Sequence, residues 1–171
     1  NKNNKNYDTR NLQEFYLDNK EKIEDLAVSI PSSIYLNLNY KLYPLSGVSN
    51  ATTILGNENG YYALYKSDRN GFNNPDKERD KSIEYLIVGD SYAQGNAVNR
   101  PKDIASQIRI LVKKKSINNT ALTLGNGGSG PLIYFARLKE YHTSPVKNVI
   151  WLHYEGNDLL DLKNELNSKK L

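Results

Sequence analysis

The regular alternation of apolar runs and helix-like segments from residue 83 onward is the feature that most restricts the fold of this chain. Three short apolar runs are each followed by a segment whose apolar residues recur with helical spacing. The runs are IEYLIV (83–88), ALTLG (121–125) and VKNVIWLHY (146–154), and the segments are DIASQIRILVKK (103–114), PLIYFARLKEY (131–141) and LLDLKNEL (159–166). Strands that alternate with helices favour parallel pairing and right-handed crossovers. The sequence therefore predicts an α/β fold, with a mainly parallel sheet in three α/β/α layers.

The first eighty residues have a different pattern. Residues 12–30, LQEFYLDNKEKIEDLAVSI, space their apolar side chains almost as a helix does, and Pro31 limits this predicted helix. Two stretches rich in Tyr and Leu follow, SIYLNLNYKLYPL (33–45) and GYYALYKSDRNGFNNP (60–75), and their loose alternation predicts short strands or a hairpin arm. We divide the chain into an N-terminal helix with a small β-rich arm, residues 1–80, and an α/β domain, residues 81–171.

Length and composition exclude several classes of function. The chain has 171 residues, which suits one domain with a sizeable core. No apolar run approaches the ~18 residues that a membrane-spanning helix requires, so the sequence predicts no membrane span. The net charge of +4 comes from scattered basic residues, and the one tight cluster, Lys113 to Lys115, ends a predicted helix, where cations complement the helix dipole. We therefore predict no nucleic-acid partner. The absence of cysteine removes thiol nucleophiles.

Polar or Gly-rich turns come directly after the three predicted strands. They read GDS at 89–91, GNGGSG at 125–130 and EGND at 155–158. In an open parallel sheet such turns share the carboxyl edge, which is where these sheets bind ligands. A serine that attacks an ester needs a base and also donors for the charge on the carbonyl oxygen. Ser91 is the candidate nucleophile, and Gly128 and Asn157 are candidate donors.

These turns resemble the first three sequence blocks of the SGNH (GDSL-like) hydrolases, in the order that this family has. The match covers roughly residues 83–162, and the arm NENGYYALYKSDRNGFNNP (57–75) is similar to one found in a bacterial SGNH subgroup. The resemblance implies a flavodoxin-like α/β/α fold and a serine esterase that acts on an ester or an O-acetylated carbohydrate, or transfers the acyl group to a sugar. It implies Ser91 as nucleophile, with an oxyanion held by Ser91, Gly128 and Asn157. It implies no cofactor, and it favours an extracytoplasmic location.

Two departures from the family pattern bear on activity. The third block commonly begins with Gly where this chain has Glu155, and the fourth block, an Asp-x-x-His that supplies the base, is missing. His142 and His153 are preceded at the required distance by Lys139 and Ile150 rather than Asp, so we interpret them as a helix-end residue and a locally bonded strand residue. We expect the chain to be truncated before the fourth block, to begin at an interior position and to be nearly inert alone. We expect a form that contains the block to be active.

Three further interpretations stay open. GNGGSG satisfies the Gly-x-Gly-x-x-Gly pattern of a dinucleotide site, with Glu155 about 25 residues beyond it. A non-catalytic carbohydrate-binding or scaffold domain would keep the sheet without the base. We also predict that an aromatic residue of the arm, Tyr61, Tyr62 or Phe72, packs near the serine turn and shapes a pocket for an acyl group or a sugar; a satellite core beneath a loop is the alternative.

Overall fold

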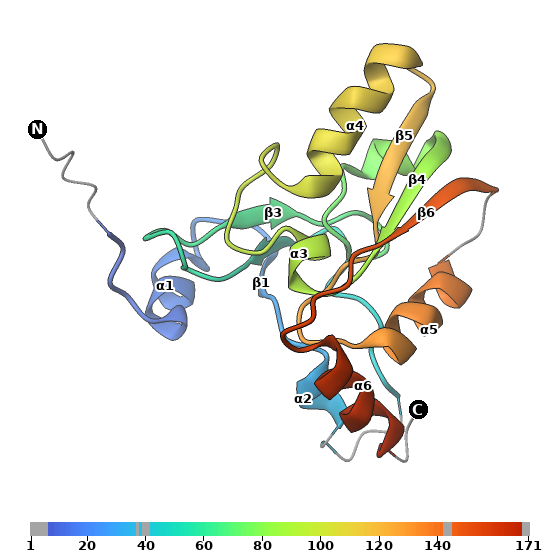
Figure 1. Ribbon diagram of the computed structural model, residues 1–171. Helices are drawn as coiled ribbons and strands as arrows, with labels where there is room; N and C mark the ends of the chain where they lie inside the picture. Colours follow the sequence, from blue (N-terminus) through green and yellow to red (C-terminus); the bar gives the residue numbers. More distant parts are fainter. Residues whose placement is uncertain (1–6, 37, 39–41, 142–144, 169–171) are drawn as a thin grey trace, which may run out of the picture.

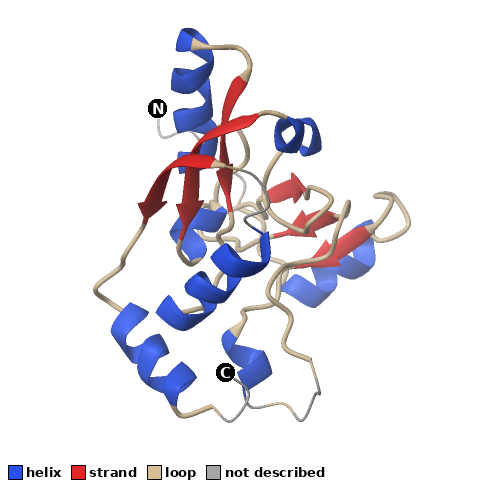
Figure 2. Ribbon diagram, turned by 90° about the vertical axis from the view of Figure 1, so that its right-hand side faces the viewer, coloured by secondary structure: helices blue, strands red, loops and turns tan. Residues whose placement is uncertain are grey.

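The computed structural model describes residues 7–36, 38, 42–141 and 145–168, and it has an α/β fold with two small sheets. Figure 2 shows these sheets as two separate groups of strands. The predicted α/β class is therefore confirmed. Within the described residues, none of the helices has the length and apolar character needed to cross a membrane.

The C-terminal sheet contains three strands in the order β5-β4-β6, and both strand pairs are parallel. The strands are β4 (Ser82–Val88), β5 (Asn119–Thr123) and β6 (Val146–Trp151), and the helices are α3 (Ser91–Gln94), α4 (Ile104–Lys115), α5 (Pro131–Tyr141) and α6 (Asp158–Leu166). Asp103 caps α4 by accepting a hydrogen bond from Ser106 N, and Pro131 occupies the first position of α5. The three strands and three long helices lie where the periodicity predicts them.

The central strand β4 is buried on both faces over its last three residues, because alternate residues of a strand point to opposite sides of the sheet. Leu86 and Val88 pack in one apolar cluster with Tyr134 of α5. Ile87 packs in another with Ala105 of α4. In Figure 1, α4 and α5 lie on opposite sides of the arrows for β4, β5 and β6. Because the three strands are parallel, their carboxyl ends lie at the same edge of the sheet.

The N-terminal sheet has the order β1-β2-β3, with β1 parallel and β3 antiparallel to the central strand. Its strands are β1 (Leu26–Val28), β2 (Thr52–Ile54) and β3 (Leu64–Lys66). The same part of the chain contains the helices α1 (Leu12–Asn19) and α2 (Ser33–Leu36) and the 3-10 helix η1 (Asp76–Asp80). A helix followed by a small β-rich arm is therefore present.

The predicted helix over residues 12–30 is wrong beyond Asn19. The Asn19 side chain donates a hydrogen bond to the carbonyl oxygen of Phe15 and so satisfies an acceptor of the last turn. Asp25 adopts a left-handed backbone conformation with φ 53°, which a right-handed helix does not contain, and Leu26 then pairs with Thr52 in the sheet. Pairing with a strand distant in sequence thus overrides the local helical spacing.

The strand predicted in residues 33–45 is also wrong for the part that the structure describes, because Ser33–Leu36 form the short helix α2. Pro31 starts this turn: its carbonyl oxygen accepts from Ile34 N at 3.1 Å. Ser32 N and Ser33 N donate instead to the glycine loop, to the carbonyl oxygens of Gly127 and Gly128. Residues 37 and 39–41 lie outside the described part of the chain.

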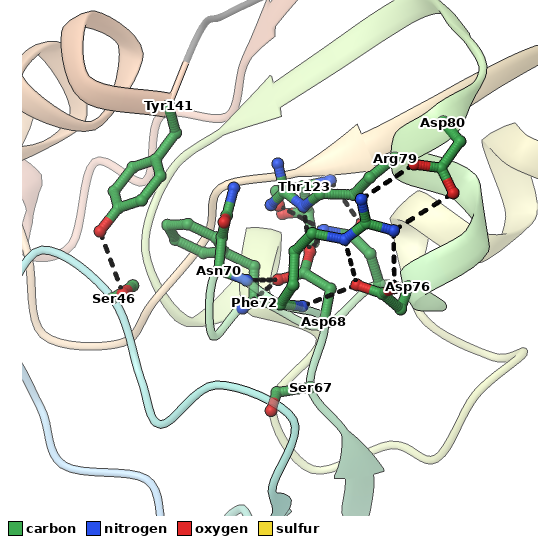
Figure 3. Close-up of polar contacts among 12 residues, drawn as sticks. Ser46, Ser67, Asp68, Asn70, Phe72, Asp76, Arg79, Asp80, Thr123 and Tyr141 are labelled. Carbon is green, nitrogen blue, oxygen red and sulfur yellow. Dashed lines mark hydrogen bonds and ion pairs between the residues drawn. The ribbon is translucent and has the colours of Figure 1, made fainter.

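Asp68 organises the arm from its buried position after β3, as Figure 3 shows. One carboxylate oxygen accepts hydrogen bonds from the backbone N–H groups of Asn70 and Phe72. The other accepts from Asn74 Nδ2 at 2.8 Å and from Arg79 Nε at 2.7 Å. A buried charge is tolerated only when it is paired and bonded in this way. The segment from Asp68 to Arg79 is therefore held by one side chain.

Two asparagine amides attach this segment to the C-terminal part of the chain, one to β5 and one to α3. Asn74 Nδ2 donates to the carbonyl oxygen of Thr123, and Asn74 Oδ1 accepts from Thr123 N, so the side chain pairs with β5 as a neighbouring strand would. Asn73 Nδ2 donates to the carbonyl oxygen of Gln94 at 2.8 Å. The arm thereby braces both β5 and the turn that carries Ser91.

Candidate functional site

The serine turn joins the end of β4 to helix α3. Asp90 is the N-cap of α3, and its Oδ1 accepts from Tyr92 N at 3.3 Å, so this carboxylate braces the turn. Ser91 is the first helical residue and is half-buried. Among the described residues, neither the hydroxyl nor the backbone N–H of Ser91 has a hydrogen-bond partner. Both groups are therefore free to contact a ligand.

The glycine loop between β5 and α5 lies against this turn. A Cβ placed on Gly127 would lie 3.7 Å from the Cβ of Ser91, and the Gly127 N–H donates to Gln94 Oε1 at 2.9 Å. Gly128 has φ 64°, and a Cβ there would lie 2.7 Å from the Cβ of Pro31, so only glycine fits. Within the described chain the Gly128 N–H has no acceptor. The loop thus offers one free amide.

A cavity of about 500 Å³ lies between the serine turn, the glycine loop and the N-terminal segments. Its lining consists of Leu12, Ser29, Pro31, Ile54, Leu55, Gly56, Asn57, Tyr62, Ser91, Gln94, Asn96, Gly127 and Gly128. The structure therefore brings two of the three predicted site residues, Ser91 and Gly128, to one cavity. Of the aromatic residues considered in the arm, Tyr62 lines this cavity, Tyr61 lines a different one, and Phe72 is buried against the sheet.

Asn157 lies at the same sheet edge, as the N-cap residue of α6, but it does not line this cavity within the described residues. Its Nδ2 donates to Asp90 Oδ2 at 3.1 Å and to Asp161 Oδ2 at 2.9 Å. Both protons of the amide are thus engaged with carboxylates. Burial raises the pKa of Asp161, and the charges of Asp90 and Asp158 add to this effect. Asn157 connects α6 to the serine turn through Asp90.

His153 follows β6 and forms a pair with the buried Asp158. Its Nδ1 lies 3.0 Å from Asp158 Oδ2, while Asp158 also accepts from Tyr134 OH and from Tyr154 N. The local bonding expected for His153 is therefore present, but the expected position in a strand is wrong, because β6 ends at Trp151 and His153 is exposed. It does not line the cavity of Ser91 in the described part of the chain. His142 lies outside the described residues.

The N-terminus of α5 is already occupied by a carboxylate. Glu165 is buried, and its two carboxylate oxygens accept from Gly130 N and from Leu132 N. A dinucleotide would place its pyrophosphate at such a helix N-terminus. A Cβ on Gly125 would lie 2.3 Å from backbone atoms of Ala93 and Gln94, so this glycine serves close packing. These contacts count against the dinucleotide interpretation of GNGGSG.

Replacement of Glu165 by Gln is expected to alter how stability depends on pH. Burial raises the pKa of Glu165 above 4.5, although the N–H groups of Gly130 and Leu132 oppose this shift. The native state then holds the proton more tightly than the unfolded chain, so ionisation destabilises the fold as pH rises through that pKa. The unfolding free energy of Glu165→Gln minus that of wild type should increase between pH 4 and pH 7.

Urea unfolding at the two pH values measures this difference. Glu155→Gln, in the exposed turn before α6, controls for the change in net charge. A difference between Glu165→Gln and wild type that is the same at both pH values would contradict the raised pKa that we attribute to the burial of Glu165.

Two residues that support the glycine loop had no signal in the sequence. Gln94 donates through Nε2 to Ser29 Oγ and to Asn126 Oδ1, and so joins the serine turn to the arm and the loop. Arg137 is fully buried beneath the loop, where it donates to Ser129 Oγ and Ser32 Oγ at 2.8 Å. Burial lowers the pKa of Arg137 to about 10. Because this value is still above neutral pH, the side chain carries its positive charge there. Only the three-dimensional contacts identify either residue.

Comparisons with protein-family models, with curated proteins and with solved structures gave no match to this chain. The described residues also contain no group of three or more His, Cys, Asp or Glu side chains arranged to hold a metal ion. The function of this chain is therefore inferred from the residues of the site and from the motifs GDS, GNGGSG and GND.

Proposed function

We propose that this chain is a serine ester hydrolase of the SGNH type, with Ser91 as the nucleophile. The observation that carries the proposal is the cavity that Ser91 and Gly128 share, where the Ser91 hydroxyl and the two backbone N–H groups are unpaired among the described residues. A nucleophile beside preorganised N–H donors is the arrangement that acyl transfer requires. The three-layer arrangement of the SGNH fold is part of this proposal.

In the proposed reaction, Ser91 Oγ attacks the ester carbonyl carbon, and the N–H groups of Ser91 and Gly128 stabilise the negative charge on the carbonyl oxygen. The serine proton passes through a base to the departing alcohol, and water then releases the acyl group by the same route. Asn157 becomes a third donor if one of its bonds to Asp90 or Asp161 is released. None of the described residues forms a hydrogen bond with Ser91 Oγ, so the proposal assigns no base.

Prolonged labelling with a p-nitrophenyl alkylphosphonate tests this proposal, because N–H donors that stabilise the developing negative charge would let Ser91 react slowly even without a base. Mass spectrometry of the digested protein should find the adduct on Ser91, and Ser91→Ala should remove it. Ser29→Ala is a matched control, since Ser29 lines the same cavity but its hydroxyl accepts from Gln94. An adduct that persists in Ser91→Ala would overturn the assignment of the nucleophile.

A non-catalytic domain is the second candidate function, and the absence of a base beside Ser91 among the described residues favours it. Such a domain would use the cavity for binding alone. The two candidates differ in the labelling experiment, because a domain without an activated serine gives no adduct on Ser91 even after prolonged incubation with the phosphonate.

A further inference from the structure

We infer that the cavity beside Ser91 binds a linear hydrocarbon acyl chain longer than acetyl, rather than a sugar. This assignment of the acyl group rests on the proposed function. Leu12 of α1, Pro31, and Ile54 and Leu55 at the end of β2 supply apolar wall, together with the ring of Tyr62. The reactive hydroxyl of Ser91 lies at the same cavity. An acyl chain attached at Ser91 would therefore have apolar surface to contact.

The polar side chains of the wall are already bonded to protein, which argues against a sugar. Gln94 is engaged with Ser29 and Gly127. Asn96 accepts from Gly56 N at 3.0 Å and donates to Glu58 Oε1 at 3.1 Å. Two more side chains of the wall are also bonded to protein. Asn57 Nδ2 donates to the carbonyl oxygen of Asp8, and Tyr62 OH donates to the carbonyl oxygen of Arg10.

A sugar hydroxyl that entered this cavity would lose its bonds to water and would find few partners in exchange. Groups left unpaired in this way oppose binding, whereas burial of methylene groups favours it. Among the described residues that line the cavity, only Asn57 has a buried side-chain oxygen without a hydrogen-bond partner, and this Oδ1 is closed off from solvent. The wall therefore selects an apolar group over a polyhydroxylated one.

The size of the cavity favours several carbons. A methylene takes up about as much room as a water molecule, roughly 30 Å³. An acetyl group would leave most of the volume of about 500 Å³ empty, while a six-carbon chain would fill roughly a third of it and leave room for the alcohol portion. The N-terminal residues that line the cavity, between Leu12 and Tyr62, thus determine which length of acyl chain fits.

Binding of neutral, non-hydrolysable N-methylamides tests the inference without requiring catalysis. Affinities are measured by titration of the ¹⁵N-labelled chain from N-methylacetamide to N-methylhexanamide, with methyl β-glucoside as the sugar probe. Each added methylene should tighten binding by about two- to four-fold. The amide signals of Ser91, Gly127 and Leu55 should shift.

Leu12→Asp should weaken N-methylhexanamide binding by about ten-fold or more, because it places a charge in the apolar wall. The substitution suits the first turn of α1, where an acidic residue complements the helix dipole. Gln13→Asp adds the same charge at the next, exposed position and should bind as wild type does. Leu12→Trp fills part of the cavity and should shift the preference to shorter chains, a readout independent of charge.

Affinity that does not change with chain length, or tighter binding of the glucoside at the same amides, would overturn the inference. If the phosphonate labels Ser91 while chain length has no effect, the hydrolase stands and the acyl specificity fails. If chain length matters while Ser91 is never labelled, the apolar ligand class is supported and the hydrolase is overturned.

Discussion

Hydrolysis of p-nitrophenyl acetate by the 171-residue chain is expected to exceed the uncatalysed rate by no more than about 10³- to 10⁴-fold. This is the acceleration that remains when a serine hydrolase lacks one member of its triad. The physical reason is that a serine hydroxyl is a weak nucleophile near neutral pH unless a base takes its proton. Among the described residues no base lies within hydrogen-bond distance of Ser91 Oγ, and His153 Nδ1 is paired with Asp158. Binding of the substrate and the backbone N–H groups of Ser91 and Gly128 would supply this remaining acceleration.

Imidazole added to the buffer should supply the missing base and raise the rate in proportion to its concentration. Ser91→Ala measured under identical conditions gives the background from imidazole itself, and the difference between the two proteins reports the serine. His153→Ala should leave that difference unchanged. Rapid turnover without imidazole that disappears in His153→Ala would instead make His153 the base, and turnover that survives in Ser91→Ala would remove the serine from the mechanism.

Asp68→Ala is expected to destabilise the chain by about 3–5 kcal/mol, the usual cost of removing one partner from a buried ion pair. The side chain of Arg79, which is also largely buried, would lose its carboxylate. The N–H groups of Asn70 and Phe72 and the amide of Asn74 would lose acceptors at the same time. Denaturant unfolding followed by circular dichroism measures the difference.

Asp76→Ala is the matched control for this experiment. Asp76 makes two hydrogen bonds to the Arg69 guanidinium, but both side chains are substantially exposed, so its loss should cost less than about 1 kcal/mol. If the two variants lost equal stability, the claim that Asp68 holds the arm through a buried network would be contradicted.

The sheet and the place of its turns could be predicted because their determinants are local. Apolar runs and helical spacing are properties of neighbouring residues, and parallel pairing follows from the alternation of strands with helices. Ser91 and Gly128 lie at one cavity because parallel strands expose their carboxyl ends at one edge. The prediction that the chain has no membrane span agrees with the helices of the described residues. The hydrolase assignment and the domain boundary at residue 80 stay predictions.

The remaining features depend on contacts that sequence spacing does not encode. Strand β1 was predicted as helix because its partner, Thr52, lies 26 residues beyond Leu26. Glu165 caps a helix that begins more than 30 residues before it, which no capping pattern near Pro131 reveals. The amide of Asn157 was expected to face the substrate, but it is shared between two carboxylates whose positions are set by tertiary packing.

Ser32 shows in what order the cavity can be assembled. Its hydroxyl accepts hydrogen bonds from Asn126 and Arg137, which follow it by 94 and 105 residues, and Ser29 and Gln94 are 65 residues apart. Contacts between such distant segments form late, because the entropy of closing long loops opposes them. On the ribosome, the arm emerges long before its partners do. A nascent chain halted before residue 137 would therefore leave the apolar wall uncovered, with the glycine loop still unanchored.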